Sequence, residues 1–411
     1  MEDKECVVIA TIIRGLSLNA IKYPWIVAYE RGEKTVPSDA LVVDIALAFR
    51  EGVIDEEAAA KVFLEAYTAW EFDKAPGGIE AAMMQDPVKK IPSCIVVRHG
   101  ENSGAGEVFY WIDRDIDAMR RRMQAGSGSV LEEKLPQNTA FATEVKFDAA
   151  DRANVVNHKV ALLVGDTRDT AVIARSLAAS GALVFIADMA QDAAAQLANA
   201  INTSARRTAA IPVPVASADE HSVEALFNTI VETTGGLDLC IYHDSALRQG
   251  SVLEQTLEAF QALDTLFFLI AKYAGLLLKR QARTALTWKT DIIHINHGRL
   301  GAKLEKVDAQ GLIASFVHEL AAYSIKVNVV SPGNYFELPF WTDPETGLFA
   351  QDLKTGKLPG VKSIAEVRAF YEARVLLKRG CTAQDIMRAI FYVIEQDYET
   401  GRVLPVSGGQ G

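Results

Sequence analysis

Residues that could hold an anion or transfer a proton gather in two stretches of this chain. Residues 164–171 place one glycine, Gly165, with two aspartates and an arginine between an apolar run and a helical pattern. Backbone N–H groups of such a strand–turn–helix segment can hold a phosphate where glycines let it approach. Further along, His297 ends another apolar run and Lys306 begins an amphipathic one. Because histidine titrates near neutral pH, His297 is a candidate general acid.

The elements that must position these residues begin at Lys159, where apolar runs start to alternate with amphipathic helical patterns. We predict strands at 159–164, 183–187, 211–215, 238–242, 291–296, 325–330 and 402–406. The intervening helices are predicted to begin near residues 170, 190, 221, 256, 306 and 382. Such alternation indicates an α/β fold, a doubly wound parallel Rossmann-type sheet of about seven strands. Its ligand crevice is expected at the carboxyl ends of the strands.

The first 130 residues predict a separate, smaller and mainly helical α+β domain that contains a β-hairpin. Its elements are two helices at 38–51 and 55–72, two strands at 94–98 and 108–112, and a basic helix at 116–123. Ser38 or Asp39 and then Asp55 are the expected helix caps. Residues 131–156 are predicted to be a linker, and residues 157–411 the Rossmann-type domain.

Composition argues against several classes of partner. The 411 residues carry a net charge of -11, which disfavours nucleic acid and anionic membranes. The longest apolar run, 266–278, contains Lys272 and is too short to span a bilayer. Four scattered cysteines without a CxxC pair indicate free thiols in a reducing compartment and no metal site. The charged N-terminus lacks a signal-peptide pattern, so we expect a cytoplasmic protein.

Three segments carry a family resemblance. Residues 325–333 (IKVNVVSPG), 401–409 (GRVLPVSGG) and 159–165 (KVALLVG) resemble the sixth, seventh and first strands of the short-chain dehydrogenases/reductases. The resemblance covers residues 157–411 and implies a dinucleotide-binding fold. It implies nothing about residues 1–150, and most of the family's chemical residues differ.

The resemblance makes the turn at 164–171 the expected pyrophosphate site, but only Gly165 of its glycines remains. Asp166 and Asp169 stand where the two phosphates would lie. At ~4 Å and an effective dielectric near 20, each like-charge contact would cost roughly 4 kcal/mol before screening, and Arg168 could offset part of that. Asp188, at the end of the second strand, favours NAD over NADP if a dinucleotide binds. A cofactor site, an empty turn and a simple strand-end role for Asp188 all remain open.

The positions that the resemblance assigns to catalysis are also altered. His297 takes the place of the serine that orients the carbonyl, and Ala302 that of the tyrosine acid. Lys306 matches the lysine that binds the nicotinamide ribose, although a lone lysine at a helix start also suits a surface. Tyr242-His243-Asp244-Ser245 replaces the small residues that shape the cofactor pocket, and Glu337 the carboxamide-binding threonine.

Two helices that the resemblance associates with oligomers retain apolar faces. They are predicted at 257–279 and 306–323, and in the family they form a four-helix contact across a two-fold axis. The same apolar residues would also serve to cover the sheet. We therefore expect a homo- or hetero-oligomer, with an active short-chain dehydrogenase as one candidate partner.

The leading hypothesis is a short-chain-dehydrogenase-like pseudoenzyme that acts as a structural or regulatory subunit and carries no cofactor. One alternative is a divergent NAD(P)-dependent oxidoreductase that uses Lys306 or His297. Another is a non-redox module that binds a different ligand, such as an acyl thioester or a nucleotide, in the Rossmann crevice. No substrate follows from the sequence.

Overall fold

The structure is a computed structural model. It describes residues 2–20, 25–32, 34–50, 52–74, 88–100, 107–113, 115–125, 131–134, 155–244, 257–285, 290–296 and 308–409. Within these ranges, no helix is both long enough and apolar enough to cross a bilayer. The four cysteines are free, as predicted.

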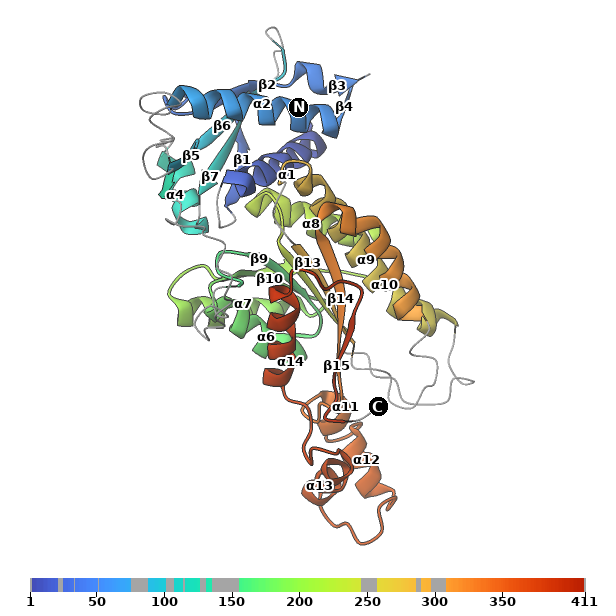
Figure 1. Cartoon of the computed structure of the whole chain (residues 1–411). Helices are drawn as coiled ribbons and strands as arrows, with labels where there is room; N and C mark the ends of the chain where they lie inside the picture. The colour runs from blue at the N-terminus through green and yellow to red at the C-terminus, as the bar shows by residue number, and fades with distance from the viewer. Residues whose placement is uncertain are drawn as a thin grey trace, which may run out of the picture.

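A seven-stranded sheet with strands in the order β11-β10-β9-β12-β13-β14-β15 forms the larger part of the molecule (Figure 1). Every neighbouring pair is parallel. The doubly wound Rossmann-type sheet is therefore confirmed. Its strands are β9 (Val160–Val164), β10 (Leu183–Asp188), β11 (Ala210–Pro214), β12 (Leu239–Asp244), β13 (Thr290–Asn296), β14 (Ile325–Pro332) and β15 (Val403–Val406).

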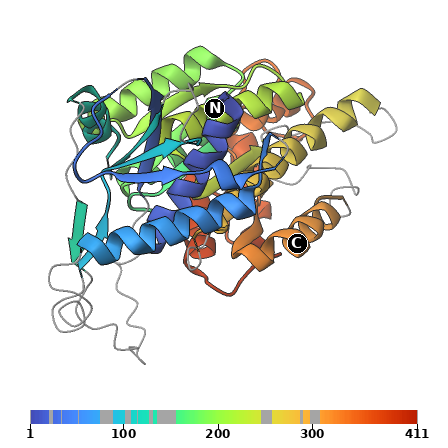
Figure 2. The same ribbon diagram turned by 90° about the horizontal axis from the view of Figure 1, so that it is seen from above.

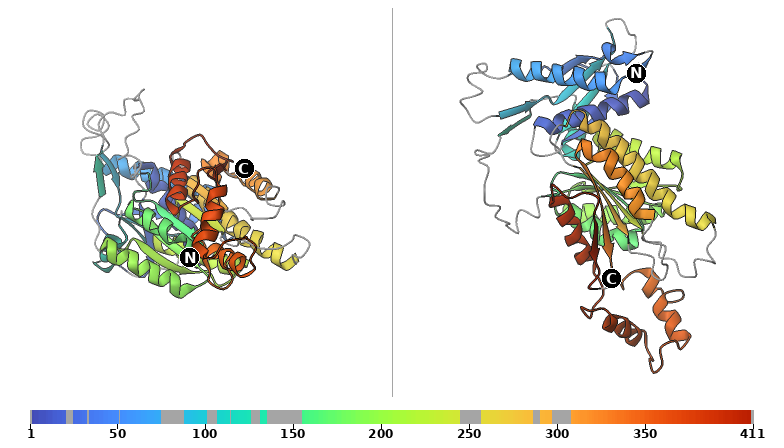
Figure 3. Two further views of the ribbon diagram at one scale, coloured as in Figure 1. Left: turned by 90° about the horizontal axis from the view of Figure 1, so that it is seen from below. Right: turned by 45° about the vertical axis from the view of Figure 1, so that its right-hand side comes forward.

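Helices cover both faces of this sheet (Figure 3). One face packs against α6 (Thr167–Ala179), α7 (Gln191–Ala205) and α14 (Ala383–Glu395), whose apolar side chains join one buried cluster. The other face packs against α8 (Glu220–Thr234), α9 (Leu257–Ala282) and α10 (Asp308–Leu320). The predicted helix starts lie within three residues of these. Strands that are buried on both faces explain the nearly continuous apolar runs of the sequence.

Three short helices that were not predicted lie beyond the carboxyl ends of the strands. They are α11 (Pro339–Thr342), α12 (Leu348–Lys354) and α13 (Ile364–Arg374). Their core is aromatic: the rings of Phe336 and Phe349 lie 4.8 and 5.3 Å from Trp341, and Tyr371 lies 5.3 Å from it. These ring contacts hold together helices that are too short to be stable alone.

The N-terminal region is a second α+β unit around the mixed four-stranded sheet β1-β7-β6-β2. The predicted hairpin is confirmed as two antiparallel strands, β6 (Cys94–Arg98) and β7 (Val108–Asp113). The other elements are α1 (Asp3–Ala20), β1 (Ile26–Arg31), β2 (Leu41–Asp44), η1 (Ala46–Ala48), β3 (Phe49–Arg50), β4 (Val53–Ile54), α2 (Glu56–Lys74), β5 (Val88–Ile91), α4 (Ile116–Ala125) and β8 (Leu131–Lys134).

One sequence prediction for this unit is wrong. In place of the helix expected at 38–51, Leu41 and Val43 alternate with exposed residues and form a strand paired with β6. Strand β8 lies inside the segment 131–156 and pairs with β5, and the linker predicted there stays a prediction. In contrast, the helix predicted from Asp55 is confirmed. The Asp55 carboxylate accepts hydrogen bonds from two backbone N–H groups of the first turn of α2.

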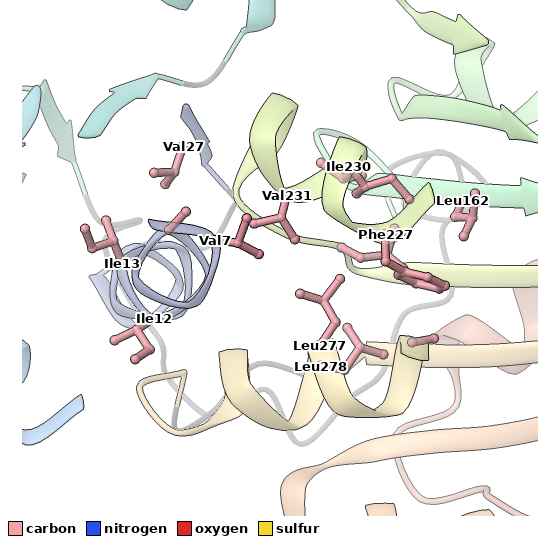
Figure 4. Close-up of a cluster of buried hydrophobic side chains, with 14 of the residues drawn as sticks. Val7, Ile12, Ile13, Val27, Leu162, Phe227, Ile230, Val231, Leu277 and Leu278 are labelled. Atoms are coloured by element: carbon pink, nitrogen blue, oxygen red, sulfur yellow. The ribbon is translucent and has the colours of Figure 1, made fainter. Parts of the chain in front are cut away.

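The N-terminal unit sits over the amino-terminal ends of the seven strands (Figures 1 and 2). Helix α1 packs against α8 and α9, and Figure 4 shows Val7 of α1 facing Val231 of α8, while Ile13 lies on the side of α1 toward Val27 of β1. One buried apolar cluster therefore spans the two units. We call this contact the domain seam and define it by Arg14, Glu56 and Asp117 of the N-terminal unit together with Thr208, Asp238 and Gln281 of the sheet unit.

A fully buried ion pair lies at the centre of the domain seam. The Arg14 guanidinium lies 2.7 Å from the Asp238 carboxylate, and both side chains are 0% exposed. Arg14 also donates to Gln281 at 2.8 Å, while the Asp238 carboxylate accepts the N–H of Val160, the first residue of β9. Because both charges are paired and further hydrogen-bonded, the seam avoids the cost of an isolated buried charge.

Candidate functional site

The candidate site is the turn between β9 and α6, which the sequence singles out as a phosphate site. Gly165 has φ +146°, and a Cβ there would lie 2.8 Å from the carbonyl oxygen of His243 on β12. Only glycine meets both demands without strain. The sheet order places this turn at the carboxyl edge, where open α/β sheets bind ligands.

Two aspartates of the protein itself accept hydrogen bonds from the first amides of α6. The Asp188 carboxylate accepts the N–H of Thr167 at 2.7 Å, and the N-cap Asp166 accepts the N–H of Arg168 at 2.9 Å. These N–H groups belong to the helix end that would face a bound phosphate. The structure thus brings Gly165 and Asp188 together at one turn, but the Asp188 carboxylate bonds to backbone.

Arg168 does not point its charge at an open anion site. Its guanidinium folds back onto Asp166, with the Nε atom 2.9 and 3.0 Å from the two carboxylate oxygens. The Arg168 hydrogen bond holds the pKa of Asp166 below its usual range. The arginine of the turn is therefore paired with Asp166, one of the two acids of the turn.

The remaining acid of the turn, Asp169, is only 6% exposed. Burial, followed by the nearby charge of Asp166, raises its pKa to about 7. Tyr335, which follows the Pro332-Gly333 turn, lies close enough for Asp169 to contribute to a raised tyrosine pKa, after burial. Tyr335 was not predicted as a site residue, although an aromatic residue just past a Pro-Gly turn at a strand end was a usable signal.

Beside the turn, β12 and β13 place aromatic groups where the resemblance expects a cofactor pocket. His243 is 2% exposed, and burial lowers its pKa to about 3, with a smaller contribution from His294. The His294 ring stacks on Phe267 with centroids 4.2 Å apart and lies 5.4 Å from Tyr242. Since the imidazole of His243 is neutral at physiological pH, it adds bulk without positive charge.

The other predicted site residues are not joined to this turn by any described contact. His297 and Lys306, the two candidate catalytic residues, lie outside the described residues, as does Ala302. Glu337, at the carboxamide position, pairs with Arg368 of α13 at 2.7 Å. Among the described side chains, no group of three or more His, Cys, Asp and Glu could hold a metal ion.

Sequence comparison finds relatives of the sheet unit. A profile of the family described as enoyl-(acyl carrier protein) reductase matches residues 170–336. The sorbitol-6-phosphate 2-dehydrogenase of Escherichia coli is 27% identical over 266 residues, which are 62% of this chain and 98% of that protein. The trans-4-hydroxycyclohexanecarboxylate dehydrogenase of Sinomonas cyclohexanicum is 28% identical over 268 residues, 62% of this chain and 93% of that enzyme.

Solved structures give the same result. The sorbitol-6-phosphate 2-dehydrogenase of Erwinia amylovora aligns with a TM-score of 0.53 and 28% identity, over 61% of this chain and 99% of that one. A short-chain dehydrogenase/reductase of Mycobacterium marinum shares the fold with a TM-score of 0.50 and 20% identity, over 64% of this chain and 98% of that one. With the parallel sheet order and the three motif segments, these matches support membership of the sheet unit, residues 157–411, in the short-chain dehydrogenase/reductase family.

Proposed function

We propose that this protein is a catalytically inactive member of its family that acts as a structural or regulatory subunit in an oligomer. The proposal depends on one observation: carboxylates of the protein itself accept the first two N–H groups of α6. A pyrophosphate would have to displace Asp166 and Asp188 from these groups. It would also have to approach the buried Asp169.

Charge works against a dinucleotide at the same place. A phosphate next to a carboxylate at ~4 Å costs roughly 4 kcal/mol at an effective dielectric of 20. Arg168 pairs directly with Asp166, and its charge lowers the pKa of Asp169 too little to offset burial. His243 fills space beside Gly165 without supplying charge at neutral pH. We therefore expect no bound NAD(P) in the isolated protein.

The test is a calorimetric titration of the purified full chain with NAD, NADH, NADP and NADPH. We expect no binding up to millimolar concentration and no turnover, while an active dehydrogenase of the family binds under the same conditions. The double variant Asp166→Ser/Asp169→Gly should gain measurable affinity because it removes two like charges. Asp192→Ser, on the exposed first turn of α7, is the matched control. Micromolar binding by the unaltered protein would refute the proposal.

The oligomer contact is proposed on α9 and α10. Phe268 and Leu276 of α9 are 42% and 51% exposed, and the Phe268 ring lies 6.3 Å from that of Phe316 on α10. A partner that buried this apolar strip would remove it from water. The contact is open to a second copy or to an active dehydrogenase of the same fold.

Light scattering after size exclusion tests this contact. Phe268→Glu should dissociate the oligomer, whereas Leu47→Glu, at an 88% exposed apolar residue of the N-terminal unit, should not. The proposal fails if the chain is monomeric both alone and in the presence of every dehydrogenase that co-purifies from its native cell. It also fails if the two variants behave alike.

A second candidate function is a divergent oxidoreductase. The relatives favour it because two of them are named as dehydrogenases, and the alignment with this chain covers nearly the whole length of each. In that case His297 or Lys306 would supply the proton. The nucleotide titration distinguishes the two functions. If the unaltered protein binds, then His297→Ala and Lys306→Ala decide which side chain takes part.

A further inference from the structure

A pocket lies at the domain seam, on the opposite edge of the sheet from the turn discussed above. It has a volume of about 250 Å³. Leu183, the first residue of β10, lines it, so the length of that strand, ~17 Å, separates it from the candidate site. A ligand here would be independent of whether a dinucleotide binds at the carboxyl edge.

Both units build the walls of this pocket. Ile26 of β1 and Asp115 and Ile116 at the start of α4 line one side, while His158, Leu183 and Arg207 of the sheet unit line the other. The two walls are held in place by a contact that crosses the seam. The Asp117 carboxylate accepts the Thr208 hydroxyl at 2.7 Å and the Thr208 N–H at 3.0 Å.

The floor of the pocket is apolar and buried. Ile26, Ile116 and Leu183 are 4%, 2% and 6% exposed, and they belong to one packed cluster that includes Trp111. A ligand must therefore present an apolar body to this floor. Since a water molecule takes up about 30 Å³ in the liquid, the pocket has room for roughly eight non-hydrogen atoms.

The polar side chains at the rim of the pocket, Arg207, His158 and Asp115, indicate which head group the ligand would carry. Arg207 is half-buried, and in the described contacts its Nη2 atom donates to the Ala178 carbonyl at 3.2 Å. A guanidinium has five N–H donors, so further donors remain for a planar anion. His158 adds a second nitrogen-bearing side chain to the lining.

The acid on the rim limits the charge of the ligand. Oδ1 of Asp115 accepts the backbone N–H groups of Asp117 and Ala118 at 2.8 and 3.0 Å, which caps α4. Two of the first four N–H groups of α4 are thus already bonded to Asp115, which weakens this helix end as an anion site. Asp115 also repels a phosphate dianion more strongly than a carboxylate with one charge.

We propose that this seam pocket binds a small monocarboxylate with an apolar body, its carboxylate on Arg207 and its chain on Ile26, Ile116 and Leu183. A bound carboxylate contacts both units and therefore stabilises their association by mass action. The ligand class follows from the pocket's size, its apolar floor and its guanidinium.

Sodium hexanoate is the probe, because it has eight non-hydrogen atoms. Binding to the full chain is measured by ligand-detected NMR titration, with hexylamine and 1-hexanol as probes of equal chain length. We expect hexanoate to bind with a Kd of roughly 1 mM or tighter, a range that ligands of this size can reach. The amine and the alcohol should bind at least tenfold more weakly, since they lose the charged hydrogen bond.

Arg207→Gln should weaken hexanoate binding roughly tenfold or more, because it removes that charged hydrogen bond. Its matched control is Arg206→Gln, which alters the exposed neighbour outside the pocket. The midpoint of thermal unfolding, measured without ligand, shows that both variants are folded at the titration temperature. Equal affinity in the two variants, equal binding of hexylamine, or no binding of hexanoate at 20 times the expected Kd, roughly 20 mM, would each overturn the proposal.

Discussion

Buried charges are paired differently at the two ends of the strands of the seven-stranded sheet, which we call its amino-terminal and carboxyl edges. At the amino-terminal edge, Arg14 and Asp238 are fully buried but directly paired, and Gln281 completes the network. At the carboxyl edge, three aspartates crowd around one arginine, and Asp169 stays buried among like charges. The first arrangement is a stable interface, and the second retains unfavourable electrostatics in the folded state.

The contrast between the two edges shows where the stabilising contacts of the sheet unit lie. Across the amino-terminal edge, a shared apolar cluster and a buried ion pair join two units into one body. At the carboxyl ends of the strands, two carboxylates of the protein itself accept hydrogen bonds from the first two N–H groups of α6. The buried ion pair and the shared apolar cluster thus lie at the domain seam, which agrees with the proposed role as a structural subunit.

The largest expected effect is at the centre of the seam. Arg14→Met leaves Asp238 buried without its partner and should lower the free energy of unfolding by roughly 3–5 kcal/mol. Arg50→Met, which breaks an ion pair whose arginine side chain is 78% exposed, should cost less than about 1 kcal/mol. Urea unfolding followed by circular dichroism measures both. Similar losses in the two variants would mean that the buried pair adds little.

At the opposite edge, a substitution should stabilise the protein. Because its pKa is raised to about 7, Asp169 favours the folded state below pH ~4, and this contribution is lost as the pH rises through 7. Asp169→Asn should therefore gain roughly 2–4 kcal/mol over the natural chain at pH 8 and almost nothing at pH 4. Asp192→Asn, at an exposed acid of α7, should change little at either pH. A gain that did not depend on pH would rule out the electrostatic explanation.

Gly165→Ala separates backbone strain from steric contact. Gly165 and Gly32 have similar φ angles of +146° and +141°, but only at Gly165 would a Cβ meet other atoms, the nearest at 2.8 Å. We expect a loss of about 1 kcal/mol for Gly32→Ala and about 2–3 kcal/mol for Gly165→Ala. Thermal unfolding of the two variants gives the difference. If the two losses were equal, the approach of His243 would not be what requires glycine.

The smallest effect is expected at the margin of the seam. Glu56 pairs with Arg280 at 2.8 Å and with Arg283 at 3.3 Å, and all three side chains are about a quarter exposed. Glu56→Gln should cost about 0.5–1 kcal/mol, and less at high salt. Glu57→Gln, its exposed neighbour, is the control for the same helix turn. A salt-independent loss in Glu56→Gln would point to packing instead of charge.

Local patterns were sufficient for most of the sheet unit. The seven strands were predicted within two residues of their bounds, because buried parallel strands produce apolar runs between amphipathic helices. The N-terminal unit was harder. Strand β2 has only four residues and pairs with β6 about fifty residues later, so its strand state depends on a distant partner. Helices α11 to α13 depend in the same way on aromatic contacts that no short window contains.

Some features of the candidate site could likewise be predicted from local sequence, and others depend on distant contacts. Gly165 and Asp188 were recognised as site residues, and the clash of aspartates with phosphate followed from charge alone. The hydrogen bond from the Thr167 N–H to Asp188 could not be predicted from the sequence. It joins residues 21 positions apart, which are brought together because β9 and β10 are paired.

The sequence by itself determined the order of strands and helices in the sheet unit, the family resemblance, and the single glycine of the turn after the first strand, because these depend on residue type and short-range periodicity. Only the tertiary structure decided that Arg14 meets Asp238, 224 residues away, and that a pocket opens between the two units. The physical reason is that the free energy of a buried charge depends on the group that it contacts. That group can be far away in the sequence, so only the tertiary structure brings the two together.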